Sequence, residues 1–290
     1  TSPAKGVIRV QTCHHAGMSA KSPAFELNTG EGNMSVTETD ELITITSGDL
    51  SLEITKLPWS MTYKHKGRVL SKSGRKDLAL MKTDWKGYAY DKGDYTDTYI
   101  RQQLSMGVGE LLYGFGERFT PFVKNGQSID IFNQDGGTST EQSYKNIPFY
   151  VSNKGYGVFV NHPEKVSFEV GTEMVTKAEF SVEGSYLDYF FIDGPSMKDV
   201  LVKYTDLTGK PSLPAPWTFG LWLSTSFTTN YDEKTVMSFI DGMLDRGIPL
   251  RVFHFDCFWM KEFHWSDFVW DERVFPDPEG MLKRIKAKGL

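Results

Sequence analysis

The chain has 290 residues, 39% of them hydrophobic and 14% aromatic, and a formal net charge of −5 at pH 7. This length suits about two modest domains, and the apolar share is enough to build a buried core. The acidic balance offers no basic face that could neutralise phosphates, which excludes a nucleic-acid partner. Cys13 and Cys257 form no disulfide framework, and no apolar run reaches the ~18 residues of a membrane span. We therefore expect a cytoplasmic protein that binds neither nucleic acid nor membrane.

Residues 42 to about 194 form a series of short strand patterns. Segments 42–47 and 50–55 alternate apolar and polar residues, which is typical of half-buried strands. Asn153-Lys-Gly155 is a hairpin signal, because glycine adopts positive φ freely. Many strands without long helices between them predict an antiparallel sandwich or barrel. The expected strands are 42–47, 50–55, 60–65, 68–70, 147–152, 156–161, 166–170, 175–182 and 187–192.

A helical pattern and then a proline-rich segment follow the strands. The helix is expected over 196–208 and ends at Gly209. Residues 210–216 contain three prolines in seven positions, and proline neither continues a helix nor fits a central strand. We predict one domain over 1–215, with this short linker helix at its end, and a second from 216 to 290.

The pattern after the linker is strand, helix, strand, helix. Segment 219–224 is nearly continuous in apolar residues, which predicts a strand buried on both faces. Asn230 is expected to cap the first helix, with Glu233 completing a capping box. A second strand over 250–255 precedes a helix with Asp277 as N-cap and proline at its first position. Two parallel strands do not make a stable α/β domain, so we expect the chain to stop inside one.

The strongest chemical feature is a carboxylate at the end of the second strand. Asp256 is followed directly by Cys257, Phe258 and Trp259. In a (β/α) barrel the carboxyl ends of the strands and the loops after them build the active site. A carboxylate among aromatic rings suits sugar binding, because the acid accepts hydroxyl hydrogen bonds and the rings cover apolar faces. The alternative that Asp256 caps the next segment and the rings are core remains open on chemistry alone.

Other kinds of site are not indicated. Gly-rich pairs near residues 107 and 114 lack the spacing of a phosphate loop, and no Gly-x-Ser-x-Gly elbow exists. Cys13, His14 and His15 are adjacent, so on a strand they point apart rather than converge on a metal. We expect neither a cofactor nor a metal.

Five segments follow one another along the chain: Gly114-Phe-Gly-Glu-Arg-Phe119, Asn133-Gln-Asp-Gly-Gly-Thr138, Tyr144-Lys-Asn-Ile-Pro-Phe-Tyr150, Ser224–Tyr231 and His254–Lys261. Together they resemble glycoside hydrolase family 31, and most of all its bacterial α-xylosidases. The resemblance implies an antiparallel, mutarotase-like β-sandwich (a supersandwich) followed by the first two βα units of a (β/α)8 TIM barrel. It also implies hydrolysis, with retention of configuration, of α-xyloside or closely related α-glucoside oligosaccharides from the non-reducing end. We expect the full-length protein to be a homo-oligomer.

The resemblance assigns no catalytic residue to this chain. Retention needs two carboxylates ~5–5.5 Å apart, one as nucleophile and one as acid/base. The family carries these aspartates after barrel strands four and six, which would lie beyond Leu290. We expect the 290 residues alone to be inactive. The alternative is a non-catalytic carbohydrate-binding sandwich with a vestigial barrel start.

Three substrate-binding residues follow from the matching motifs. Asp256 matches the aspartate that holds sugar hydroxyls in subsite −1. Phe227 matches an aromatic residue at the pocket wall. Asp135 matches a sandwich-domain loop that reaches over the barrel mouth, where the neighbouring glycines would permit the turn.

Four further residues after the second strand are assigned to substrate binding. Cys257 and Phe258 stand where the α-glucosidase branch has Ile-Asp. A bulky apolar ring there would crowd a hydroxymethyl group and favour xylose, which lacks one. Trp259 and Lys261 match the motif without an assigned contact.

Overall fold

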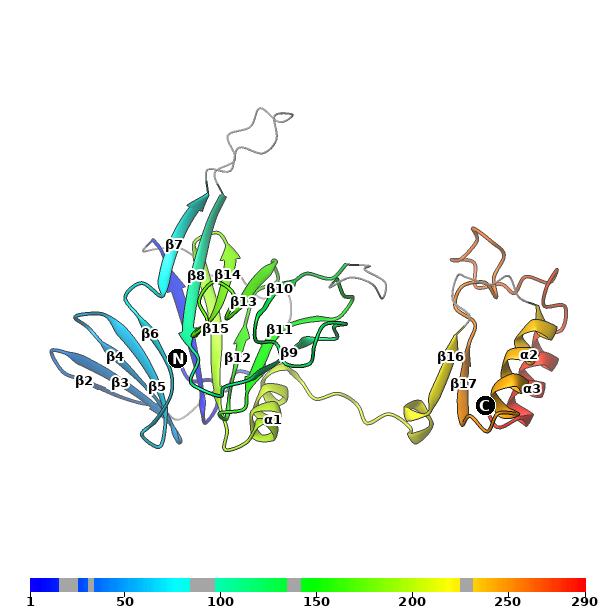
Figure 1. The fold of residues 1–290 in the computed structure, drawn as a ribbon, viewed down its shortest axis with the longest axis horizontal. Helices are drawn as coiled ribbons and strands as arrows, with labels where there is room; N and C mark the ends of the chain where they lie inside the picture. Colours follow the sequence, from blue (N-terminus) through cyan, green and yellow to red (C-terminus); the bar gives the residue numbers. More distant parts are fainter. Residues whose placement is uncertain (16–25, 31–33, 84–96, 135–141, 225–231) are drawn as a thin grey trace, which may run out of the picture. The chain divides into compact units, whose positions relative to one another are not determined.

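The computed structural model describes residues 1–15, 26–30, 34–83, 97–134, 142–224 and 232–290. The chain divides into two compact units, Thr1–Lys210 and Pro211–Leu290 (Figure 1). The division falls at the start of the proline-rich segment that follows the helix at the end of the first unit.

The first unit contains three five-stranded sheets in which all neighbouring strands run antiparallel (Figure 1). One sheet has the order β1 (Val7–Cys13), β15 (Tyr186–Asp193), β12 (Tyr156–Val160), β11 (Asn146–Ser152) and β9 (Leu112–Gly116). The second has the order β10 (Gln127–Ile131), β13 (Val166–Val170), β14 (Lys177–Glu183), β8 (Asp97–Ser105) and β7 (Leu78–Thr83). The third has the order β2 (Ser35–Glu38), β3 (Leu42–Ser47), β4 (Leu50–Thr55), β5 (Ser60–His65) and β6 (Arg68–Gly74).

One hydrophobic core joins the three sheets. Buried residues such as Leu52 on β4, Phe168 on β13 and Phe191 on β15 belong to the same cluster. The ring of Tyr63 on β5 stacks on Phe191 with centroids 3.9 Å apart, and its hydroxyl lies 2.8 Å from that of Tyr189. Each buried hydroxyl thereby has a partner, which avoids the penalty of an unpaired polar group. The predicted antiparallel β-sandwich is confirmed.

Helix α1 (Met197–Thr208) covers the outer face of the sheet that contains β11, β12 and β15. Its N-cap is Ser196, whose side chain accepts a hydrogen bond from the Asp199 N–H. Val200 and Leu207 are buried against the sheet, and Tyr204 stacks on Phe149 at 4.0 Å. The helix therefore seals a second, smaller apolar cluster on the outside of the sandwich.

The second unit has two parallel strands and two helices. The strands β16 (Leu221–Ser224) and β17 (Leu250–His254) pair in parallel. Helix α3 (Pro278–Ala287) begins as predicted, because Asp277 accepts the Gly280 N–H and proline occupies the first helical position. The remaining elements are the 3₁₀ turn η1 (Pro216–Phe219) and helix α2 (Glu233–Leu244).

The N-cap of α2 differs from the sequence prediction. The cap is Asp232, whose Oδ1 accepts both the Thr235 N–H and the Thr235 hydroxyl at 2.8 Å. Glu233 is then the first helical residue instead of the third. The prediction of Asn230 as the cap, a residue outside the described ranges, is therefore wrong. The two hydrogen bonds between Asp232 and Thr235 start the helix at this aspartate, two residues later than the spacing of the predicted capping box indicated.

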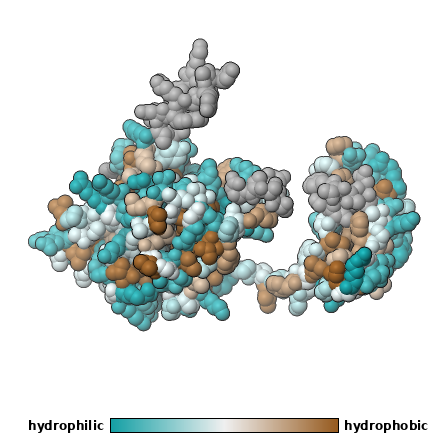
Figure 2. All heavy atoms as spheres, in the orientation of Figure 1, coloured by the Kyte–Doolittle hydropathy of each residue, from teal (hydrophilic) through white to brown (hydrophobic). Residues whose placement is uncertain are grey.

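The burial of β16 also differs from prediction. The strand was expected to be buried on both faces, yet Leu221 is 41% and Trp222 48% exposed. Within the residues that the structure describes, β17 is the only strand that pairs with β16, so the other edge of β16 has no neighbouring strand. Figure 2 shows brown, hydrophobic patches on a surface that is otherwise mostly hydrophilic or neutral.

The closest of the backbone approaches at glycines of the first unit is the one between β9 and the start of β11. Gly116 has φ +86°, and a Cβ built on it would collide with the carbonyl oxygen of Lys145. Gly116 is the register partner of Asn146, and the register shifts between Asn146 and Tyr150. Position 116, the last residue of the Gly-Phe-Gly segment of β9, is a glycine because no side chain fits between the two chains there.

We predict that Gly116→Ala destabilises the chain by more than about 3 kcal/mol, since backbone strain and steric overlap add. The matched control is Gly126→Ala. Gly126 also has positive φ, +81°, but nothing lies within 4 Å of its added Cβ. The control should lose only about 1–2 kcal/mol. Urea unfolding of the 290-residue chain, followed by far-UV circular dichroism, measures both. Equal losses would refute the role of the close approach.

Candidate functional site

Asp256 lies two residues beyond the carboxyl end of β17, at the start of a tight turn. Its φ is +56°, in the left-handed region that few non-glycine residues adopt, although aspartate is tolerated there better than most. The Met260 N–H closes the turn on the carbonyl oxygen of Cys257 at 3.1 Å. Backbone in this sparsely populated region persists only where the surrounding structure fixes it, and such residues concentrate at functional sites.

The neighbouring strand ends at the same level. Ser224, the last residue of β16, is in register with His254, and its hydroxyl lies 3.2 Å from the Nδ1 of His254. The carboxyl ends of the two parallel strands therefore lie side by side, as expected for a barrel-like sheet. Phe227 follows Ser224 by three residues but lies outside the described residues.

The loop after Asp256 is closed into a unit by a short bridge and by aromatic contacts. Met260 and Trp270 form an isolated antiparallel bridge, and the Asp271 N–H donates to the carbonyl oxygen of Trp259 at 2.9 Å. The rings of Trp259 and Trp270 are 5.1 Å apart. The Arg273 guanidinium, hydrogen-bonded to both carboxylate oxygens of Asp271, holds the pKa of that carboxyl below its usual value.

The predicted site residues of this loop differ in their surroundings. Phe258 and Trp259 are half-buried and pack against the hydrophobic cluster that α2, α3 and β17 share. Phe258 also meets Trp265 edge-on at 5.9 Å. Lys261 is exposed. The rings of Phe258 and Trp259 therefore contribute at least in part to the packing of the loop. Asp256 and Cys257 lie at the carboxyl end of the strand, where a (β/α) barrel builds its binding site.

Cys257 is half-buried, and its environment disfavours the thiolate. Burial, and then the negative charge of Asp256, raise the pKa of the Cys257 thiol. A neutral thiol behaves as a small apolar side chain, so the residue after Asp256 offers no charge to a ligand.

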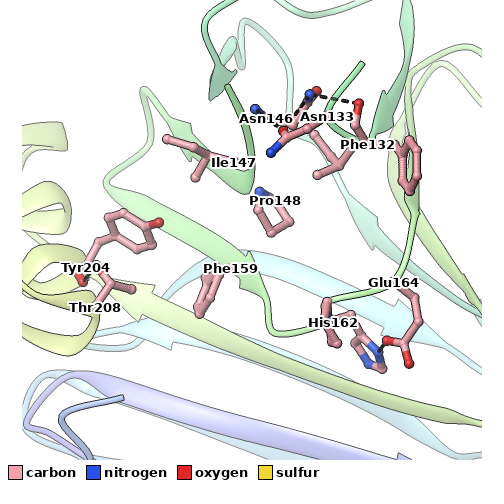
Figure 3. A pocket seen from close by; sticks show the side chains of 12 residues that line it. Phe132, Asn133, Asn146, Ile147, Pro148, Phe159, His162, Glu164, Tyr204 and Thr208 are labelled. Carbon is pink, nitrogen blue, oxygen red and sulfur yellow. Dashed lines mark hydrogen bonds and ion pairs between the residues drawn. The ribbon is translucent and has the colours of Figure 1, made fainter. Parts of the chain in front are cut away.

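The first unit contains a pocket of about 630 Å³ beside the end of α1 (Figure 3). Its floor is formed by Phe159, Pro148 and the ring of Tyr204, and polar groups stand at its edges. At one edge the Nδ1 of His162 lies 3.3 Å from a carboxylate oxygen of Glu164. Sequence reasoning missed this pocket, because its lining comes from segments that are far apart in the chain. The residues of the lining are Ile131, Phe132, Asn133, Asn146, Ile147, Pro148, Phe159, His162, Pro163, Glu164, Tyr204 and Thr208.

Asp135, the remaining predicted site residue, lies outside the described residues. The chain on either side of it is described. Asn133 and Ser143 form an isolated parallel bridge, and the Gln134 N–H donates to the carbonyl oxygen of Ser143 at 3.0 Å. Asn133 and Asn146 stand side by side at the polar edge of the pocket (Figure 3).

Within the described ranges, no group of three or more His, Cys, Asp or Glu side chains could hold a metal ion. No helix in the same residues is both long and apolar enough to span a bilayer.

Comparison with known families matches each unit separately. The model of the glycosyl hydrolase 31 N-terminal galactose mutarotase-like domain covers residues 1–169. The model of the glycosyl hydrolases family 31 TIM-barrel domain covers residues 211–290. Together with the sandwich and the two parallel βα units, these matches define the class as the glycoside hydrolases. The chain belongs to glycoside hydrolase family 31, as its five motifs predicted.

Curated relatives match the whole chain. An α-xylosidase of Emericella nidulans is 49% identical, and the α-xylosidase XylQ of Lactiplantibacillus pentosus is 48% identical, each over 100% of this chain. The matched region is 39% of the first relative and 37% of the second. The chain therefore spans less than half the length of these relatives.

Solved structures share the fold at lower identity. A family 31 dextranase of Flavobacterium johnsoniae superimposes with a TM-score of 0.77 at 23% identity, over 99% of this chain and 34% of the dextranase. A family 31 α-xylosidase from a soil metagenome, complexed with xylose, gives 0.73 at 16% identity, over 99% of this chain and 42% of its own. These matches confirm a sandwich followed by the start of a TIM barrel.

The raised pKa of Cys257 gives a test of the charge environment at the strand end. In a Cys13→Ser background, Cys257 is the sole cysteine. At pH 8 it should react with iodoacetamide more slowly than a cysteine in a short peptide, because less thiolate is present. Adding Asp256→Asn removes a negative charge and lowers the thiol pKa, so alkylation should become faster. Asp267→Asn in the same loop is the control and should leave the rate unchanged. An equal rate with and without Asp256→Asn would contradict the predicted coupling.

Proposed function

We propose that these residues belong to a retaining α-glycosidase that removes α-linked xylose from the non-reducing end of oligosaccharides, with related α-glucosides as poorer substrates. The observation that carries the proposal is whole-chain identity of 49% and 48% to two α-xylosidases. The strand-end Asp256 with its apolar neighbours supports it. Cytoplasmic location and homo-oligomerisation stay predictions from the sequence.

Asp256 is proposed as a binding residue and not as an acid or nucleophile. Retention needs a pair of carboxylates ~5–5.5 Å apart. The family resemblance assigns that pair to later barrel strands. An ionised aspartate at a strand end can accept hydrogen bonds from two sugar hydroxyls, and charged hydrogen bonds are roughly twice as strong as neutral ones. Its left-handed backbone stands directly before the turn that the Met260 N–H and the Cys257 carbonyl oxygen close.

Specificity for xylose is proposed to come from Cys257 and Phe258. Xylose and glucose differ by one CH₂OH group. A neutral thiol and an apolar ring offer no strong hydrogen-bond partner for the extra hydroxyl, so burying it there costs ~1–3 kcal/mol. Phe258 is held by Trp265 and by the apolar cluster behind it, which limits its freedom to move aside. Phe227, Asp135, Trp259 and Lys261 are proposed to complete the binding surface.

Asp256→Ala should lower kcat/KM for an aryl α-xyloside by roughly 10²-fold or more, because hydrogen bonds to a charged group are lost in the transition state. The measurement uses a protein in which the rest of the barrel follows these 290 residues. Asp267→Ala is the matched control, since Asp267 lies in the same loop and its carboxylate contacts His264 at 2.9 Å. The control should stay within ~3-fold of the parent. An active, folded Asp256→Ala protein would return Asp256 to a purely structural role.

Phe258→Asp combined with Cys257→Ile should narrow the xyloside-to-glucoside ratio of kcat/KM by about 10–200-fold, the range for one small group in a pocket. The aspartate offers an acceptor to the hydroxymethyl group, and removal of the ring relieves the clash. Because Phe258 also packs in the loop, melting temperature is measured alongside the kinetics. Equal loss of both activities with a lower melting temperature would show that Phe258 only supports the fold.

A further inference from the structure

Three of the five family motifs meet at one point of the first unit, through side chains that no role in sugar binding explains. Arg118 comes from the Gly-Phe-Gly-Glu-Arg-Phe segment, Asn133 from the Asn-Gln-Asp-Gly-Gly segment, and Asn146 from the Tyr-Lys-Asn segment. Asn146, the first residue of β11, stands between the other two. Figure 3 shows the two asparagines joined at the edge of the pocket.

The Asn146 side chain binds both chain ends that flank residues 135–141. Its Nδ2 donates to the carbonyl oxygen of Phe132 at 2.9 Å and to the Oδ1 of Asn133 at 3.1 Å on one side. It donates to the carbonyl oxygen of Ser143 at 2.8 Å on the other. The backbone N–H of Asn146 adds a bond to the Oδ1 of Asn133 at 3.1 Å. The side-chain amide of Asn146 therefore holds the two chain ends together. The ends are also joined directly, because the Gln134 N–H donates to the carbonyl oxygen of Ser143.

Arg118 holds Asn146 in turn. Its Nη2 donates to the Oδ1 of Asn146 and to the carbonyl oxygen of Asp130 at 2.7 Å, and its Nε donates to the carbonyl oxygen of Phe115 at 3.2 Å. Donation from a guanidinium fixes which end of the Asn146 amide is the oxygen, so the Nδ2 must face the two chain ends. The charged group thus ties the amide to strands β9 and β10, which belong to the rigid core of the sandwich.

We infer that Asn146, oriented by Arg118, is a positioning residue for substrate binding: it sets the two chain ends from which Asp135 is presented. The inference rests on the proposed function, in which Asp135 contacts substrate. Asp135 follows Gln134 directly, so one peptide unit of ~3.8 Å separates the held backbone from the functional residue. A displacement of about 1 Å at a substrate-contacting group can lower activity by ~10²-fold.

Asn153 provides the control that separates this role from general stabilisation. It follows the other end of β11 and also bridges two backbones: its Nδ2 donates to the carbonyl oxygen of Gly109 at 3.1 Å, and its Oδ1 accepts the Leu111 N–H at 3.0 Å. None of these bonds reaches residues 132–134 or 142–143. Loss of Asn153 should therefore lower stability as much as loss of Asn146, without reaching Asp135.

The test compares Asn146→Ala, Asn146→Asp and Asn153→Ala in a protein in which the rest of the barrel follows these residues. Asn146→Ala should lower kcat/KM for an aryl α-xyloside by about 10–100-fold, while Asn153→Ala stays within ~3-fold of the parent at a similar melting temperature. Asn146→Asp keeps an acceptor for Arg118 but loses the donor to the two chain ends, so it should not restore activity. Activity of Asn146→Ala or Asn146→Asp equal to that of Asn153→Ala would overturn the inference.

A double-mutant cycle with Asp135→Ala tests whether Asn146 acts through that residue. Asp135→Ala and Asn146→Ala should divide their effects between kcat and KM in the same proportion. In the Asp135→Ala background, Asn146→Ala should lower kcat/KM by less than ~3-fold, because the group it positions is already gone. Multiplicative effects of the two substitutions would overturn the inference but leave the proposed function intact. A parent protein that hydrolyses no α-xyloside or α-glucoside would overturn the proposed function, and the inference with it.

Discussion

The approach of β9 to β11 at Gly116 governs how the first unit is organised around its polar edge. Because Gly116 has no Cβ, the carbonyl oxygen of Lys145 can lie where a side chain would otherwise collide with it. The two chains therefore approach each other closely at this position. The register of β11 shifts immediately afterwards. The first residue of β11 is thereby brought within reach of the guanidinium of Arg118, which follows Gly116 by two positions. A single glycine thus determines the position of a hydrogen-bond network.

The two units use different means to place their polar groups. In the sandwich, the buried carboxylates of Asp188 and Asp193 are paired inside the protein, the first with Arg9 and the second with His65. In the second unit, the Asp256 carboxylate stands at a strand end, and its position is fixed by backbone conformation and by the turn that follows. The sandwich therefore contributes rigid support, and the βα units contribute strand-end chemistry.

The sequence predicted those elements in which apolar and polar residues alternate, such as β3 and β4. Lys66-Gly67 makes the turn between β5 and β6, with both residues at positive φ. Strand β8 was not among the predicted strands, and Gln102 and Gln103 lie in its centre. In the structure both are buried: Gln102 donates to the hydroxyl of Ser73 at 2.6 Å, and Gln103 to the carboxylate of Glu179 at 2.5 Å. Partners this distant in sequence cannot be inferred from the polarity of a residue.

The candidate site was predictable to a similar extent. Asp256 was identified from its place after an apolar strand and from the motif, and the structure puts it at that strand end. The packing of Phe258 on Trp265 was not, since edge-on ring pairs depend on how the loop folds back. The motifs named Arg118, Asn133 and Asn146 only as members of a pattern. Their convergence needs the register of β9 and β11, which the glycine spacing alone does not specify.

The left-handed backbone of Asp256 restricts how this position can drift in evolution. Glycine and asparagine adopt φ near +56° at little cost, whereas most other side chains are strained there. Both residues are reached from aspartate by a single nucleotide change. A descendant freed from selection for the proposed sugar binding would therefore keep its fold most easily by acquiring glycine or asparagine here. Among homologues, such a residue at this position would mark loss of the proposed sugar binding, while aspartate together with the surrounding turn would mark a site still under selection for it.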